Sequence, residues 1–173
     1  MSNITKAERS TVKFFDGLEI DGYLMPDGEF RVSMSGVSLL LGFSKEWLSR
    51  GLSRGGNLVK ALRGLGFSGQ TQKVAVNSGR PPETISLKDL QRLLLYGVSQ
   101  GKPQAIALQM ALTDMALNDF FRDAFGMRAL SINEKRNRLY QAFAATLTAQ
   151  DWADWDRQDA LEIDAHLAFL GEA

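Results

Sequence analysis

The chain contains no cysteine and a single histidine, His166. Without thiols it can form no disulfide, no thiolate nucleophile and no cysteine-ligated zinc or iron–sulfur site, and one histidine cannot supply a cluster of imidazole ligands. No phosphate-binding glycine loop occurs. Most familiar catalytic arrangements are therefore absent from this sequence.

Long hydrophobic runs are also missing. No stretch of about 18 apolar residues occurs, and residues 1–13 lack the apolar core of a signal peptide. The 173 residues are 45% apolar and 23% charged, as in globular proteins. We therefore expect a folded cytoplasmic protein that does not bind membranes.

Basic and acidic residues are equal in number but are unevenly distributed along the chain. Residues 31–80 carry eight Lys and Arg against one acid, Glu46, which gives this window a net charge of +7. Residues 131–173 carry four basic and eight acidic groups. A block this rich in cations favours binding to a polyanion. The alternative is an ordinary solvated surface whose balancing acids come from elsewhere in the fold.

The first third of the chain has the pattern of a small antiparallel sheet. Residues 11–15 and 18–24 predict short strands, and the second alternates apolar with polar positions. Asp16-Gly17 and the triplet at 26–28 are turn sequences. Residues 11–33 therefore predict a β-meander that ends in the run at 29–32.

After the meander, the spacing of apolar residues changes from that of strands to that of helices, which predicts two short helices joined at Gly42. Ser35 can cap the first helix and Ser44 the second, with apolar side chains facing inward from both. DNA-binding helix-turn-helix motifs need a small residue in the first helix, which Ser38 supplies, and a glycine in the turn. One expected inner position falls on Gly51, so the match is partial.

The remaining sequence predicts mostly helices. Asn57 can cap a third helix whose leucines share one face, and residues 68–80 indicate an exposed polar hairpin. Residues 84–87 predict a strand that runs into a helix ending near Val98, followed by a helix from Pro103 to about Phe125. Ser131 and Glu134 form a capping box for one more helix. The fold class expected is α+β: a small antiparallel β-meander with a helix-turn-helix-like corner, then a mostly helical C-terminal region.

This order of parts resembles a known family. The triplet Leu41-Gly42-Phe43, the basic helices, the polar hairpin and the closing run from Thr84 to Leu93 are similar to the BRO/KilA-N type N-terminal domain of phage antirepressors and large-virus proteins. The resemblance covers residues 11–126. It implies an α+β DNA-binding domain at 1–126 and an acidic helical extension at 127–173 that serves as an oligomer or partner interface.

We therefore predict a non-enzymatic DNA-binding regulator, of the antirepressor or transcription-regulator type, without a cofactor. Its partner would be double-stranded DNA, bound by cations on phosphates and by polar side chains on base edges. A homodimer through the C-terminal helices and a repressor protein are further expected partners. The predicted DNA-binding residues are Lys45, Ser49, Arg50, Arg54, Lys60, Arg63, Gln70, Gln72 and Lys73.

Two alternatives remain open. A Mg²⁺-dependent nuclease of the PD-(D/E)xK type needs only carboxylates and a lysine, for which Asp21, Asp27, Glu29 and the stretch 70–73 are candidates, although their spacing departs from the motif. A protein-interaction module would instead bind a repressor and no DNA. The C-terminal Trp152 and Trp155 fit either a core or an interface, and we favour core; His166 fits a packed residue better than a catalyst.

Overall fold

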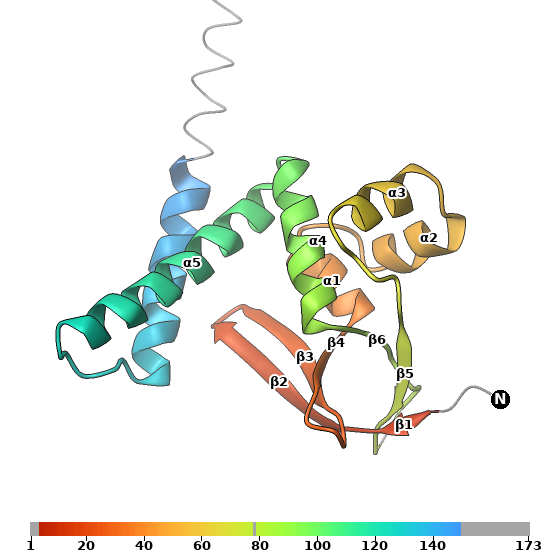
Figure 1. Cartoon of the computed structure of the whole chain (residues 1–173), viewed down its shortest axis with the longest axis horizontal. Helices are drawn as coiled ribbons and strands as arrows, with labels where there is room; N and C mark the ends of the chain where they lie inside the picture. Colours follow the sequence, from red (N-terminus) through yellow and green to blue (C-terminus); the bar gives the residue numbers. More distant parts are fainter. Residues whose placement is uncertain (1–3, 78, 150–173) are drawn as a thin grey trace, which may run out of the picture.

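The computed structural model describes residues 4–77 and 79–149, which form a six-stranded mixed sheet covered by helices (Figure 1). The predicted α+β class is confirmed. The strands follow the order β1-β5-β6-β4-β3-β2 across the sheet. The elements are β1 (Thr5–Lys6), β2 (Glu8–Phe15), β3 (Leu18–Leu24), β4 (Phe30–Ser33), α1 (Met34–Leu40), α2 (Trp47–Arg54), α3 (Asn57–Gly64), β5 (Gln72–Ala75), β6 (Glu83–Ser86), α4 (Leu87–Ser99), α5 (Pro103–Ala124) and a helix over residues 132–149.

The predicted meander is present as β2, β3 and β4. β2 and β3 are joined at Gly17, whose φ of +96° requires a residue without a side chain. The sheet is larger than predicted because β6 pairs with β4 and the hairpin partner β5 then pairs with β1 in parallel. A strand of two residues such as β1 has too few positions to show a period, so no sequence pattern indicated it.

The core lies where α1 and α4 pack against β3, β4 and β6. The fully buried side chains Val37, Leu41, Ile85 and Leu93 fill this space, joined by Leu108 of α5. α4 follows β6 without a loop, because Ser86 ends the strand and caps the helix by accepting a hydrogen bond from Asp89 N. This strand-to-helix step agrees with the pattern predicted at residues 84–98.

α5 and the helix at 132–149 form an antiparallel pair. Arg138 and Lys135 of the second helix bind Asp114 and Asp119 of α5. Phe143 is buried against Phe15 of the meander at 5.2 Å between ring centroids. The predicted capping residue is confirmed, because Ser131 Oγ accepts a hydrogen bond from Glu134 N. The extension predicted from residue 127 is thus helical and packs on the preceding domain as far as residue 149.

The elements divide into two sides of the molecule (Figure 1). α2, α3 and β5 lie on one side, and the outer part of α5 projects on the other. Among the described residues, no helix has both the length and the apolar character needed to span a bilayer. The predictions for Trp152, Trp155, His166 and the C-terminal acids concern positions outside the described residues.

Candidate nucleic-acid interface

The predicted helix-turn-helix corner is formed by α1, the turn at 41–46 and α2. Gly42 in this turn has a φ of +87°, as its predicted role requires. Both predicted caps are wrong: Ser33 caps α1 by accepting from Gly36 N, and Ser44 makes no cap because α2 begins at Trp47. Ser35 lies inside α1, since β4 passes directly into the helix one residue after Ser33.

Ser38 replaces the missing cap of α2. Its hydroxyl donates to Met34 O at 3.0 Å and accepts from Leu48 N at 3.3 Å, while Ser38 O accepts from Phe43 N in the turn. The side chain is fully buried. Leu48 N is one of the first amides of α2, which have no partner within their own helix. Ser38 of α1 therefore determines where α2 begins. The sequence predicted a small residue at this position but not the hydrogen bonds of its hydroxyl group.

Gly51, the position at which the helix-turn-helix pattern was incomplete, is where α3 contacts α2. A Cβ atom at Gly51 would lie 2.2 Å from Leu58 Cδ2. The two glycines that follow α2, Gly55 and Gly56, have φ values of +67° and +77° and reverse the chain between the helices. The missing side chain at Gly51 thus lets α3 pack closely against α2, so that their outer faces form one surface.

An aromatic stack attaches this surface to the rest of the protein. Trp47, the first residue of α2, lies 3.8 Å from Phe43 in parallel stacking and 5.9 Å from Tyr96 of α4. Lys102 places its ammonium group 4.6 Å from the Phe43 ring centroid, a cation–π contact. The stack holds α2 in a fixed orientation against α4 and adds a cation at its end.

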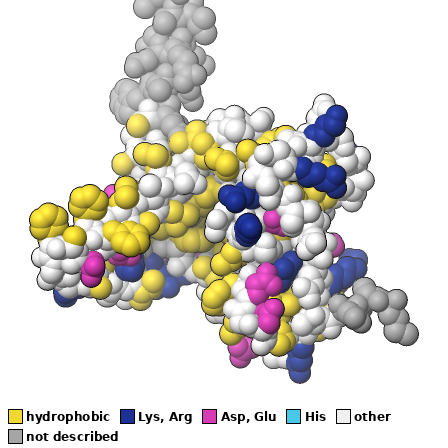
Figure 2. Space-filling model, viewed as in Figure 1, with side chains coloured by type: hydrophobic (Ala, Val, Ile, Leu, Met, Phe, Trp, Pro, Cys, Tyr) yellow, Lys and Arg dark blue, Asp and Glu magenta, His cyan; other side chains and the backbone are white. Residues whose placement is uncertain are grey.

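Five predicted cations project from α2, α3 and the turn before α2. All five are exposed, and within residues 4–77 and 79–149 none forms an ion pair with an acid. Figure 2 shows basic side chains standing out from this side of the molecule, opposite α5. We name this set the basic surface: Lys45, Arg50, Arg54, Lys60 and Arg63. Ser49 lies among these residues, exposed, with its hydroxyl donating to Glu46 O.

The predicted DNA-binding residues in β5 and just before it differ in how exposed they are. Gln70 and Lys73 are exposed, whereas Gln72 is half-buried and donates from Nε2 to Thr5 Oγ1 at 2.7 Å. β5 is also an inner strand of the sheet, with Val74 fully buried, and so the hairpin is less exposed than predicted. Gln72 therefore joins β1 to β5, and Lys73 faces Glu83 across the β5–β6 pair.

Arg31 belongs to the basic sequence window but not to the basic surface. It is 7% exposed and donates to Thr84 Oγ1, Thr84 O and Glu29. Thr84 Oγ1 in turn donates to Gln72 O. The guanidinium thus connects β4 to β6 and β5 and is not available to a ligand.

The loop after α3 is held by a residue that the sequence did not single out. Asp89 of α4 is 2% exposed and accepts hydrogen bonds from both Ser68 N, at 2.9 Å, and Ser68 Oγ, at 2.6 Å. These bonds fix the chain where it leaves α3 for β5 and present Gln70 at the surface. In the sequence, Asp89 is recognisable only as an acid in the first turn of a helix. Solvent-exposed acids also occur at this position, so the pattern did not predict a buried role.

The carboxylates considered for a nuclease do not converge. Asp21 pairs with Arg9, Asp27 accepts from Glu29 N, and Glu29 binds Arg31. Among the described residues, no three acidic or histidine side chains are placed to hold a metal ion.

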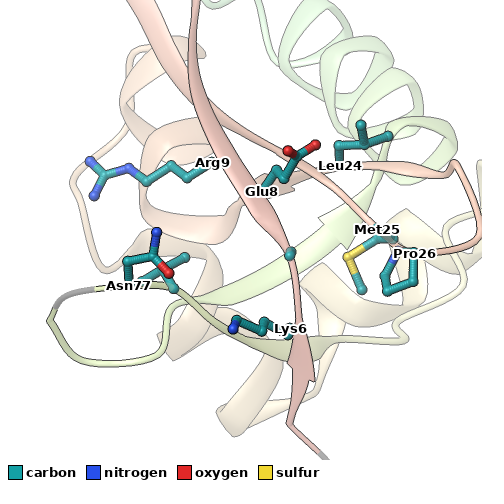
Figure 3. A pocket seen from close by; sticks show the side chains of 9 residues that line it. Lys6, Glu8, Arg9, Leu24, Met25, Pro26 and Asn77 are labelled. Carbon is teal, nitrogen blue, oxygen red and sulfur yellow. The ribbon is translucent and has the colours of Figure 1, made fainter.

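A solvent-open hollow of about 780 Å³ lies at the ends of β1 and β2 (Figure 3). Lys6, Glu8 and Arg9 line it together with apolar residues. Its charges are mixed, because Glu8 lies beside the cations and Arg9 is already paired with Asp21. The hollow therefore lacks the uniform positive charge of the basic surface.

The chain was compared with protein-family models, curated proteins and solved structures, and none of the three comparisons gave a match.

Proposed function

We propose that this protein binds duplex DNA through the basic surface on α2 and α3 and acts as a non-enzymatic regulator of the antirepressor or transcription-regulator type. The observation that carries the proposal is a set of five exposed cations that form no ion pair within the described residues and that lie on, or just before, two helices held together by buried contacts. Cations of this kind release counterions from the phosphate backbone when they bind.

The arrangement favours a structured nucleic-acid ligand over a diffuse polyanion. α2 is fixed by Ser38 and by the Trp47 stack, and α3 by its close contact at Gly51, so the cations keep a defined spacing. Ser49 and Arg50 on α2 would reach base edges, because a short exposed helix fits the major groove. Lys60, Arg63 and Gln70 would contact the backbone beside it.

The proposal is tested by removing two cations from different helices. Fluorescence anisotropy with a labelled duplex, in EDTA, should show weaker binding by Arg50→Ala/Lys60→Ala and a salt slope lower by about two, because each phosphate contact contributes about 0.9. The matched control is Arg50→Lys/Lys60→Arg, which keeps both charges and should keep the slope. An unchanged slope in the alanine variant would move the contact surface elsewhere.

The nuclease alternative is distinguished in the same preparation. Incubation with supercoiled plasmid and Mg²⁺ should leave the plasmid intact under the proposal. Cleavage that requires Mg²⁺ would instead identify a metal-dependent nuclease.

A further inference from the structure

A second surface lies at the outer end of α5, in the turn that follows it and at the first residue of the helix at 132–149. Its members are large apolar side chains that the described part of the chain leaves in solvent. Figure 2 shows apolar side chains gathered at this end of the molecule, on the side away from the basic surface. We name it the α5 surface: Leu117, Phe120, Phe121, Phe125, Met127 and Ile132.

The area of the α5 surface is comparable to the apolar part of a stable protein interface. Phe120, Phe121 and Phe125 are 75%, 64% and 77% exposed, which leaves about 400 Å² of aromatic surface in solvent. The three aliphatic members add roughly 200 Å². A standard interface buries about 800 Å² on each partner, of which about 500 Å² is apolar. A patch of about 600 Å² is also at the upper limit for a monomer that has no partner.

The outer part of α5 carries both a groove and projecting side chains. A groove of about 530 Å³ lies between α4 and α5, lined by Leu95, Leu112, Leu117 and Phe120. Phe121 and Phe125 project from the same end of α5, on the side of the helix next to the one that lines the groove. A two-fold interface requires that one patch carry both the projecting side chains and the groove that receives them.

The charges around the α5 surface do not oppose contact between two copies. Asp114, Asp119 and Glu134 are each paired within the chain, with Arg138, Lys135 and Arg128 at 2.8 to 3.0 Å. Two identical surfaces would repel each other if they carried unpaired charges of one sign. Here Asp114 and Asp119 are neutralised by the helix at 132–149 and Glu134 by Arg128. Arg92, Arg122 and Asp123 form no ion pair within the described residues, but they include both signs, so the patch does not carry unpaired charges of one sign.

We propose that the α5 surface is the interface of a two-fold dimer of this chain, in which Phe121 and Phe125 of each copy enter the α4–α5 groove of the other. The position of this interface, opposite α2 and α3, leaves both basic surfaces free to contact DNA (Figure 1). The inference does not depend on DNA binding, because it follows from the surface of α5 alone.

Sedimentation equilibrium of the full chain over a concentration series tests the dimer. The wild type should reach twice the chain mass, and Phe121→Ser/Phe125→Ser should raise the dimer dissociation constant by at least about 100-fold, because two central aromatic anchors are lost. The matched control is Phe30→Ser, which removes a phenylalanine that is 58% exposed on the sheet and should leave the dimer intact. A wild type that stays monomeric, or a double variant that still dimerises with the same constant, would overturn the proposal.

A cysteine label identifies what covers the surface, since the natural chain contains no cysteine. Asp123→Cys introduces a thiol at an exposed position on α5, whose alkylation by iodoacetamide can be followed by mass spectrometry. Protection that appears only at high protein concentration would support the second copy. Protection at every concentration would identify an occupant within the same chain, such as residues 150–173. Reactivity at every concentration would show that nothing covers the surface. Either result would overturn the proposal.

Discussion

At the scale of single residues, the proposed DNA-binding surface depends on residues that are not part of it. Ser38, Gly51 and Asp89 are buried or close-packed, and each determines where an exposed segment lies. The sequence identified the cations because exposure and charge are local properties. It missed Asp89 and misplaced the cap of α2 because their partners lie 21 and 10 residues away along the chain.

Ser38→Ala should lower the free energy of unfolding by about 1 to 3 kcal/mol, because Leu48 N would remain buried without an acceptor. Urea denaturation followed by circular dichroism measures this change. The control is Ser49→Ala, which removes an exposed hydroxyl bonded only to its own turn and should change stability by less than about 0.5 kcal/mol. Equal stability of the two variants would contradict the role given to Ser38.

At the scale of elements, the contact between α4 and α5 depends on a glycine inside a helix. Gly97 is buried, and a Cβ atom there would lie 2.8 Å from Ala105 Cβ, which is part of a rigid helix and cannot move aside. A glycine within a helix otherwise weakens it, so its presence in α4 has a packing reason.

Gly97→Ala should therefore destabilise the protein by about 1 to 2 kcal/mol, since overpacking exceeds the gain in helix propensity. Gly64→Ala is the matched comparison, because a Cβ atom at Gly64 of α3 meets nothing within 4 Å. That variant should be unchanged or more stable by up to about 1 kcal/mol. Thermal and urea unfolding of both variants measure this difference. A Gly97→Ala variant more stable than Gly64→Ala would contradict the packing role of Gly97.

The start of the helix at 132–149 should respond to acid. The hydrogen bond from Arg128 lowers the pKa of Glu134 from its usual value of 4.5. A carboxylate with a lowered pKa stabilises the fold above its unfolded pKa and loses this effect as the pH falls through its folded pKa. The protection factors for amide hydrogen exchange in the first turn should thus decrease below about pH 4.5. Glu134→Gln should remove that pH dependence; its persistence would assign the effect to another group.

The elements themselves were largely predictable from sequence. The meander, the strand at 83–86 that leads into α4, and the glycine-terminated α5 all follow from local periods and turn residues. The mixed sheet was not predictable, because β1 and β5 are short and their pairing joins residues almost seventy positions apart. The helix boundaries around the corner also shifted, since Ser33 caps α1 in place of Ser35 and Ser38, from the neighbouring helix, replaces the cap of α2.

At the scale of the whole molecule, the basic surface and the α5 surface lie on opposite sides (Figure 1). The proposed dimer would therefore carry one basic surface at each end, both free to contact DNA. Each copy supplies five cations, so the number of phosphate contacts should double when both copies bind.

On a duplex long enough for two copies, and above the dimer dissociation constant, the slope of log K against log[salt] should be about −9 for the wild type. Phe121→Ser/Phe125→Ser should give about half that slope on the same DNA. Anisotropy titrations with both proteins make the comparison. The same slope for both would show that the α5 surface does not couple two DNA contacts.

The most direct test of DNA binding is a salt series with the wild type on a random duplex of about one helical turn, which accommodates one copy. Contact of Lys45, Arg50, Arg54, Lys60 and Arg63 with phosphates predicts a slope of about −4 to −5 for log K against log[salt]. The measurement is made by fluorescence anisotropy in EDTA. Failure to bind at low salt, or a slope near zero, would contradict the account.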